Sequence, residues 1–421
     1  MWTEKLNITD LRVIDASIRD ILNRQNAKYK LQSNWSLYLP RSKGGRGLKQ
    51  VEFTYKATRI KAAMKILTDQ DPQMILVKKF DKLRMEKGRS SIIRDAISFS
   101  RDDFHSEFIA LDEGFIFKYG DPENRDTTSD SNKVSRILKK TRISDLERDR
   151  SESVWQGVTF NARNQDPDLI RNQYYQWNTK WKDCPVEVVN DIHSIILQIV
   201  PTLCFKNYRG QGDKNNTKCR LCHKSVENIP HILNNCEHFL PTFFKRRHDK
   251  ILRYIYSNLL VKYGFRSKIN PWYIDENVKP SYENEKVNLY WDIPEYLGYD
   301  DERDDKLLRP DGKLILKDQS LMLILEMSVP WITNREEKFQ EKENKYRDLI
   351  ASISVLHPTY RVEQVTLIVD SLGGYSQSLV DALKRLDFNL SERSRILHNI
   401  QKIVLTEACH IVNRFKQLTR V

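Results

Sequence analysis

The chain has 421 residues, enough for two to four domains that each bury a core without help from disulfides. Lys and Arg number 70 against 57 Asp and Glu, a net charge of +13 that is typical of proteins that contact phosphates. The longest apolar run, Ser320 to Glu326, is far shorter than the roughly 20 residues that cross a bilayer, so we expect no contact with a membrane.

Neither the N-terminal segment nor the cysteines suggest a secreted protein. The segment Met1 to Asn23 mixes charged residues with Leu and Ile at helical spacing, without the apolar core and small residues of a signal peptide. Three of the six cysteines lie close together beside a histidine, and the other three are scattered. This distribution predicts metal ligation in a reducing compartment rather than a disulfide framework.

The first part of the chain, residues 1–120, is predicted to be helical. Apolar residues recur every three to five positions, and Asp71-Pro72 is a predicted helix stop. The apolar positions are Val51, Tyr55, Ile60, Met64 and Leu67. Residues 121–133 are polar and predict a linker, after which a helical pattern resumes at Val134 and continues to Ile199.

The C-terminal part, from Pro271 onward, changes to an alternation of strands and helices. Two short strands, Lys313 to Leu316 and Leu321 to Ser328, are separated by a polar turn. A charged helix is expected from Glu336 to Ser352. A strand from Val365 to Val369, a glycine turn and a helix from Ser376 to Leu386 follow.

A basic glycine-rich turn, Leu39 to Leu48, leads into the helix that carries Lys56. Eight basic residues and one acidic residue lie between Arg41 and Lys65. Glycines let a backbone approach a phosphodiester, and Arg41, Arg46 and Lys56 would neutralise it. The alternative is a tight turn before a solvated amphipathic helix.

A cysteine-histidine cluster has the pattern C-x2-C-x8-H-x4-C, formed by Cys219, Cys222, His231 and Cys236. Three thiolates and one imidazole are the ligand set of a closed tetrahedral zinc site. The alternative is a chance cluster of small buried residues. His223 or His238 could replace His231, although His223 directly follows Cys222 and is sterically awkward.

Two carboxylates are separated by 14 residues: Asp311 after Arg309-Pro310, and Glu326 inside the apolar segment Leu321 to Val329. A hairpin would bring them together as oxygen ligands for Mg²⁺, which would activate a water and offset phosphate charge. The alternative is a structural Glu326 that is paired with a nearby cation, because a lone buried carboxylate is costly.

Three lysines, Lys338, Lys342 and Lys345, share one face of the charged helix that follows, with Tyr346 beside them. Alone they are typical of a solvated face, since Glu336, Glu337, Glu341 and Glu343 are interleaved. Together with the carboxylate hairpin they predict a nuclease in which one of these lysines acts beside the metal.

The basic turn resembles the thumb segment that follows the polymerase palm in non-long-terminal-repeat retrotransposons, through the patterns LPR-x2-GGRGL and VE-x2-YK. The resemblance implies that Arg41, Arg46 and Lys56 lie near a template-primer duplex. The palm motif of that family, Tyr or Phe, any residue, then Asp-Asp, is matched by neither Asp102-Asp103 nor Asp300-Asp301. We therefore expect no polymerase activity from this chain.

The later motifs resemble the same family in the same order. The cysteine-histidine cluster, with Glu227 four residues before His231, is similar to the knuckle between polymerase and endonuclease in elements that carry a restriction-like nuclease. Residues 246–249 also resemble that family, although a solvated helix start is the alternative. The nuclease motif is carried by Arg309, Asp311, Glu326, Val329-Pro330 and the K-x2-KY element ending at Tyr346. Ser328 occupies the usual position of the lysine.

Four regions are expected. They are a helical thumb-like nucleic-acid-binding region (1–120), a linker and helical region (121–203), a zinc knuckle with a basic flank (204–255) and an α/β domain (271–421). The fold class is thus α-helical N-terminal and middle regions, a small knuckle and a restriction-endonuclease-like PD-(D/E)xK domain.

The expected function is a Mg²⁺-dependent DNA endonuclease that nicks target DNA for target-primed reverse transcription of a retrotransposon. Asp311 and Glu326 would hold Mg²⁺, with Arg309 near the phosphate and structural Zn²⁺ in the knuckle. The resemblance implies a DNA target, the element's RNA, a polymerase domain normally in the same polyprotein and a nuclear location. The chain is then a truncated element or a fragmentary gene product. The alternative is a catalytically silent or host-adapted nucleic-acid-binding protein that keeps the knuckle.

Overall fold

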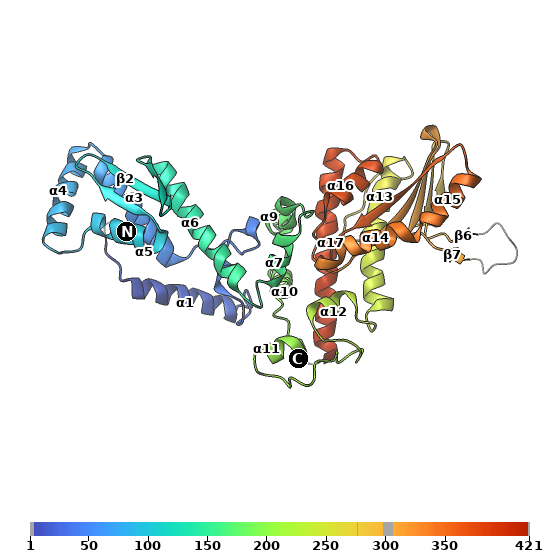
Figure 1. The fold of residues 1–421 in the computed structure, drawn as a ribbon, viewed down its shortest axis with the longest axis horizontal. Coiled ribbons are helices and arrows are strands. Elements are labelled where there is room, and N and C mark those ends of the chain that lie inside the picture. Colours follow the sequence, from blue (N-terminus) through green and yellow to red (C-terminus); the bar gives the residue numbers. More distant parts are fainter. Residues whose placement is uncertain (1–3, 276, 298–305, 420–421) are drawn as a thin grey trace. The chain divides into compact units, whose positions relative to one another are not determined.

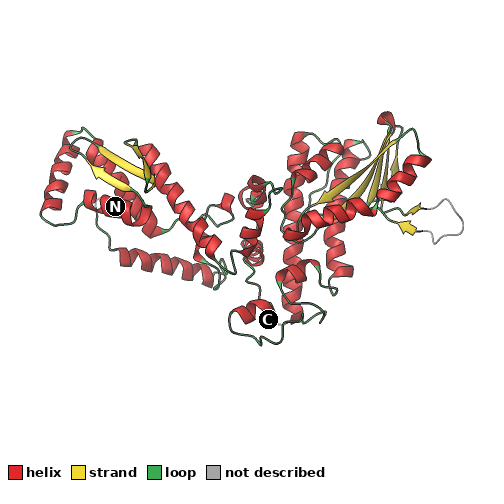
Figure 2. Cartoon of the chain, in the orientation of Figure 1, coloured by secondary structure: helices red, strands yellow, loops and turns green. Residues whose placement is uncertain are grey.

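The computed structural model describes residues 4–275, 277–297 and 306–419. About 55% of the chain is helical, and the strands form small sheets between the helices (Figure 2). The chain divides into two compact units, Met1–Val154 and Trp155–Val421. No helix in these residues is both long enough and apolar enough to cross a membrane.

The first unit is mainly helical, with one small sheet that packs against α3 and α5 (Figure 1). Its core is formed by apolar side chains of α3, α5, the sheet and α6. The elements are α1 (Ile8–Arg24), α2 (Asn34–Tyr38), η1 (Arg41–Lys43), α3 (Val51–Thr68), α4 (Pro72–Glu86), α5 (Ile92–Phe104), β1 (Glu107–Ala110), β2 (Phe115–Asp121), β3 (Asn124–Thr128) and α6 (Ser131–Glu152).

The helix stop expected at Asp71-Pro72 is confirmed. Helix α3 ends at Thr68, and the next helix begins at Pro72. Asp71 caps α4, since its carboxylate accepts a hydrogen bond from the backbone N–H of Gln73 at 2.9 Å. Proline suits the first turn of a helix, where its missing N–H has no partner to lose.

The prediction of a linker at residues 121–133 was wrong, and the helical region predicted before it is helical except for β1 and β2. Strands β2 and β3 form an antiparallel hairpin, with Asp121 opposite Asn124, and α6 begins at Ser131. The polar composition has a physical reason: β3 is the exposed edge strand of the sheet order β1-β2-β3. Such a strand needs no apolar side chains.

The second unit combines a helical part with a five-stranded sheet (Figure 1). Its first elements are α7 (Val158–Gln165), α8 (Arg171–Tyr174), α9 (Gln176–Lys180), α10 (Val186–Ile196), α11 (Leu203–Tyr208), α12 (Ile229–Asn234), η2 (Leu240–Phe244) and α13 (Lys245–Lys262). The strands and later helices are β4 (Ser281–Glu283), β5 (Val287–Trp291), β6 (Glu295–Leu297), β7 (Lys306–Leu308), β8 (Gly312–Leu316), η3 (Lys317–Gln319), β9 (Leu321–Ser328), η4 (Ile332–Asn334), α14 (Arg335–Lys345), α15 (Arg347–Leu356), β10 (Arg361–Ile368), α16 (Gln377–Arg385) and α17 (Leu390–Thr419).

The large sheet has the order β10-β9-β8-β5-β4, in which β10 is parallel to β9 and the other neighbours are antiparallel. Alternate residues of β9 enter two different cores. Leu321, Leu323 and Leu325 pack with α13, α16 and α17, whereas Met322 and Ile324 pack with α15. Because both faces are covered, β9 is apolar along nearly its whole length.

The predicted elements of this sheet are confirmed at 313–316, 321–328 and 365–369, as is the helix at 376–386. The helix expected from Glu336 to Ser352 is interrupted at Tyr346, between α14 and α15. Tyr346 is fully buried, and its hydroxyl donates a hydrogen bond to the Arg309 backbone carbonyl at 3.0 Å. This contact anchors the junction of the two helices next to Asp311.

A buried carboxylate joins α13 to the long helix α17. Glu407 has a side chain that is only 1% exposed, and it accepts a hydrogen bond from Arg246 Nε at 2.8 Å. Lys250 Nζ lies 3.4 Å from its other oxygen. Burial alone raises the pKa of Glu407, but hydrogen bonds and charge from His410 and Arg246 outweigh it and hold the pKa at about 2.

Glu407 should therefore stabilise the fold in a pH-dependent way. A folded-state pKa below the ordinary 4.5 means that its contribution is present above pH 4.5 and is lost as the pH falls towards 2. We expect Glu407→Gln to lower the free energy of unfolding at pH 7 by on the order of 3 kcal/mol and by less than half of that at pH 3. Urea unfolding at both pH values measures this, with the exposed Glu187→Gln as control. An equal loss at both pH values would contradict it.

Candidate functional site

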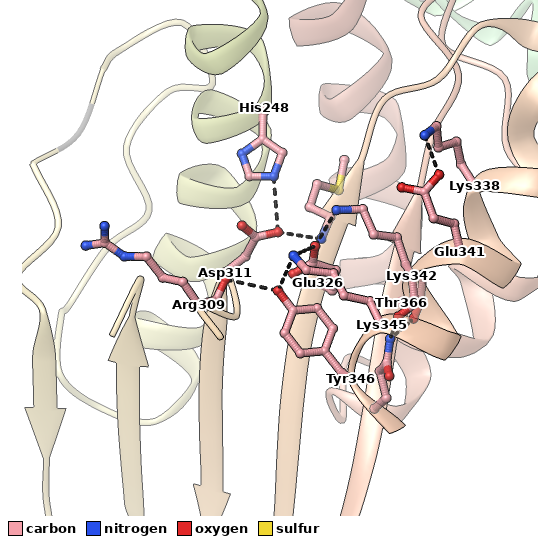
Figure 3. A network of polar contacts seen from close by, with 12 residues as sticks. His248, Arg309, Asp311, Glu326, Lys338, Glu341, Lys342, Lys345, Tyr346 and Thr366 are labelled. Carbon is pink, nitrogen blue, oxygen red and sulfur yellow. Dashed lines mark hydrogen bonds and ion pairs between the residues drawn. The ribbon is translucent and has the colours of Figure 1, made fainter. Parts of the chain in front are cut away.

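The two predicted carboxylates do come together. Gly312 of β8 pairs with Leu325 of β9, so Asp311 and Glu326 are opposite one another at the end of the hairpin (Figure 3). The side chain of Glu326 is 3% exposed and that of Asp311 is 19% exposed. The hairpin prediction is thus confirmed in its register as well as in its strands.

Strand alternation explains which side Glu326 faces. It has the same parity as Met322 and Ile324, so it points to the face covered by α14 and α15 rather than to α13 and α17. One oxygen, Oε1, forms an ion pair with Lys342, and Lys345 Nζ lies 3.7 Å from it (Figure 3). The other oxygen, Oε2, is buried and has no hydrogen-bond partner in the described part of the chain.

The electrostatic balance at Glu326 disfavours its ionised form. Burial raises the pKa of Glu326, and the nearby Asp311 carboxylate raises it further. Lys342 and Lys345 lower the pKa but do not cancel this effect. The two carboxylates offer the oxygen ligands that a hard divalent cation prefers, and Oε2 is available as one of them.

The lysine face is held in place through the backbone of α14. Gln364 of β10 donates a hydrogen bond to the Lys342 carbonyl at 2.8 Å, and the Thr366 hydroxyl bonds to Glu343. Lys345 Nζ is 2.8 Å from the Tyr346 hydroxyl. Lys342 is therefore the lysine nearest to the carboxylates, whereas Lys338 pairs with Glu341 farther along the helix (Figure 3).

The site also contains His248, which the sequence did not predict as a site residue. His248 Nε2 lies 3.1 Å from Asp311 Oδ2, and its Nδ1 lies 3.1 Å from Asp249 Oδ1 (Figure 3). Burial lowers the pKa of His248, but the hydrogen bonds and charges of Asp249 and Asp311 outweigh it and raise the pKa to about 9. Asp311 Oδ2 also accepts the Met327 N–H at 2.7 Å.

The segment 246–249 is not a solvated helix start. Arg247 is 3% exposed, and its guanidinium donates to the Val329 carbonyl at 3.3 Å. Only the resemblance of this segment to the retrotransposon family pointed to His248. Its contact with Asp311 depends on packing between α13 and the sheet, which no local pattern encodes.

A cleft of about 470 Å³ opens beside the carboxylates. Its lining includes Lys245, Arg247, His248, Arg253 and Lys342 together with Asp249, Asp292 and Asp311. Arg309 has a side chain that is 61% exposed and is 2.8 Å from Asp292. Cations and carboxylates therefore share the lining of this cleft, and Arg309, which pairs with Asp292, is not one of the lining residues.

The predicted cysteine-histidine cluster is assembled. The ligand atoms of Cys219, Cys222, His231 and Cys236 all lie within 4.8 Å of one another. Sγ of Cys219 and Cys236 are 3.9 Å apart, and Cys222 Sγ is 3.2 Å from His231 Nε2. These separations and the ligand set fit a tetrahedral metal such as zinc. Neither His223 nor His238 belongs to the cluster.

Buried polar contacts support the cluster. Glu227 is fully buried and accepts N–H groups from Leu203 and Arg220, each at 2.8 Å. The hydrogen bond between the two thiols lowers the pKa of Cys219 and raises that of Cys236, so it favours the thiolate form of one of these two ligands. Helix α12, which carries His231, ends at Asn234, whose amide donates to the Val329 carbonyl at 2.6 Å. The knuckle is thereby linked to the end of β9.

One of the three basic residues of the first unit predicted to contact nucleic acid does not lie where it was expected. Lys56 is not on the surface: its side chain is 7% exposed, and it pairs with Glu52 at 2.7 Å and with Asp103. The side of α3 that carries Lys56 is the buried side, so its charge is neutralised within the unit. Arg41 is exposed, and Arg46 is half-buried with a hydrogen bond to the Ala27 carbonyl at 3.1 Å.

The glycines of this turn are required by its own geometry. A Cβ on Gly45 would lie 2.1 Å from the Leu39 carbonyl oxygen, which no side chain can tolerate. Gly44 and Gly47 have φ of 84° and 71°, values that favour glycine. The turn thus needs these glycines whether or not a phosphate approaches it.

Models of known protein families do not match this chain, and no curated protein matches it either. Any functional conclusion therefore depends on the geometry of the carboxylates, the lysines and the knuckle.

The knuckle should bind metal tightly. We expect about one equivalent of Zn²⁺ in freshly purified protein, and chelation should expose residues 204–249 to proteases, since four ligands hold this loop together. Cys222→Ser should lose the zinc, whereas Cys204→Ser, a neighbouring cysteine outside the cluster, should retain it. Metal analysis below about half an equivalent in both the parent protein and Cys204→Ser would contradict the assignment.

The buried Glu326 carboxylate should destabilise the fold when no metal is bound. Because its environment disfavours the ionised form, we expect Glu326→Gln to melt at the same or a higher temperature in EDTA and to lose any stabilisation by Mg²⁺. If Glu326 were only a structural partner of Lys342, the substitution would instead lower the free energy of unfolding by about 3–5 kcal/mol, with or without metal. Thermal unfolding of both proteins in EDTA and in Mg²⁺ separates these outcomes.

Proposed function

We propose that this chain is a Mg²⁺-dependent DNA endonuclease with a restriction-like C-terminal domain. The observation that carries the proposal is the pair Asp311 and Glu326, held on adjacent strands with Lys342 beside it and one buried carboxylate oxygen left without a partner. The mixed sheet, with a β8–β9 hairpin, parallel β10 and helices on both faces, agrees with such a domain.

Each residue has a distinct task. Asp311 and Glu326 would hold the cation, which when bound would supply Lewis acidity to the scissile phosphate and to the attacking water. Gln364 holds the backbone carbonyl of Lys342, and the Lys342 ammonium orients that water. Lys345 adds a second positive charge beside Glu326. His248 positions Asp311 through Nε2. A phosphate would have to displace Asp292 from Arg309 before that guanidinium could contact it. Water adds to phosphorus and the O3′ leaves with a proton, which gives a 5′-phosphate and a 3′-hydroxyl.

The wider role follows from that product. In the proposal, the 3′-hydroxyl primes reverse transcription of a retrotransposon's RNA by a polymerase domain that normally belongs to the same polyprotein, in the nucleus. The knuckle and the basic first unit would hold the nucleic acids. The support for this wider role is the order of the three motifs along the chain.

Plasmid nicking tests the activity. With Mg²⁺, the full chain should convert supercoiled plasmid to open circles, and EDTA should stop the reaction. Asp311→Ala and Glu326→Ala should each lower the rate by at least about 10²-fold, the size expected for the loss of a preorganised charge contact, while DNA binding survives. Asp318→Ala, a carboxylate in the turn of the same hairpin, is the matched control and should cut normally.

Lys342→Ala should lower the cleavage rate with little change in affinity, because the ammonium acts on water and on developing charge rather than on bound DNA. Full cleavage by Asp311→Ala would refute the proposal.

A second candidate is a silent nucleic-acid-binding protein, favoured by one observation: Lys342 already pairs with Glu326, as a structural lysine would. Mg²⁺-independent DNA binding without any nicking would support it.

A further inference from the structure

A groove of about 650 Å³ lies in the first unit, far along the chain from the carboxylates. It is bordered by residues 38–50, one side of α3 and one side of α6. Its lining contains five basic residues and no acidic one; the basic residues are Arg41, Lys49, Lys61, Lys139 and Arg142. This volume is in the range that accommodates small ligands or a short segment of a polymer.

Three of the five cations in this groove are not paired with a carboxylate in the part of the chain that the structure describes. Lys49, Lys61 and Lys139 are exposed, and they form no ion pair with any residue that the structure describes. Arg142 bonds to the neutral amide of Gln50. Glu52 of α3 and Asp103 of α5 pair with Lys56 instead of with the groove cations. An anion in the groove would therefore meet several cations without competing carboxylates.

Apolar and aromatic groups lie among these cations. Tyr38 and Phe53 line the groove, and Leu48 is 38% exposed there. Arg142 lies over the Phe53 ring, 5.4 Å from its centroid. A duplex offers mainly phosphates and sugars to such a surface, because its bases are stacked inside. A single strand offers phosphates and unstacked base faces together, which aromatic side chains and cations bind jointly.

We propose that this groove binds single-stranded nucleic acid. The backbone phosphates contact Lys61 of α3 and Lys139 and Arg142 of α6, and the bases lie against Tyr38, Phe53 and Leu48. This corrects the expectation that Lys56 contributes, and it assigns the two residues of α6 a role that the sequence did not suggest. The inference is independent of nuclease activity in the second unit.

Binding of fluorescent 12-mers of oligo(U) and oligo(dT) to the full chain tests the proposal. Lys61→Ala/Lys139→Ala/Arg142→Ala should weaken binding at least about tenfold at 0.15 M salt. It should also reduce the slope of log K against log salt by about 2, as expected for three lost contacts to a single strand. Lys79→Ala/Lys87→Ala/Arg89→Ala removes the same charge from exposed positions of the first unit outside the groove. This control should change binding less than about threefold.

Two outcomes would overturn the proposal, and one further variant should support it. Equal losses in the two triple variants would show that only overall charge matters and would overturn the proposal. A loss confined to duplex DNA of equal length would also overturn it. Leu48→Asp keeps the basic residues while placing a carboxylate among them, and it should weaken oligo(U) or oligo(dT) binding as strongly as the groove triple variant. Circular dichroism of each variant verifies that it is folded.

Discussion

The burial of one carboxylate constrains the C-terminal half of this protein more than any other interaction. Strand β9 is covered on both sides, and Glu326 occupies a position that would otherwise hold an apolar side chain. An ionised group there must have cations nearby. The α14 lysines, the backbone contacts that fix α14 to β10, and the pairing with Asp311 all lie around this one side chain.

The Val329 carbonyl connects three parts of the second unit. It accepts a hydrogen bond from Asn234 at the end of the knuckle helix and lies near the buried guanidinium of Arg247. Glu326 is three residues earlier on the same strand. Unfolding of the knuckle would thus remove a hydrogen bond at the end of β9. The cluster is therefore part of the framework of the second unit.

Prediction from sequence succeeded where a pattern is local and failed where packing decides. The β8–β9 hairpin and the zinc ligand set depend on short spacings, and both are found. Lys56 looked like a surface cation because one of its two partners, Asp103, comes from another helix. The β3 strand was missed since an exposed edge has no apolar alternation. His248 approaches Asp311 from 63 residues away, a distance over which no spacing rule applies.

The position of β9 has a dynamic consequence. It has hydrogen-bonded neighbours on both edges, β8 and β10, so its amides should be among the slowest in the second unit to exchange with solvent. Helix α14 covers the sheet from outside, and all but one of its side chains are partly or fully exposed. It can open locally while the strands stay paired. Glu326 therefore belongs to the most persistent part of the fold, whereas the lysines belong to a helix that should open before the strands separate.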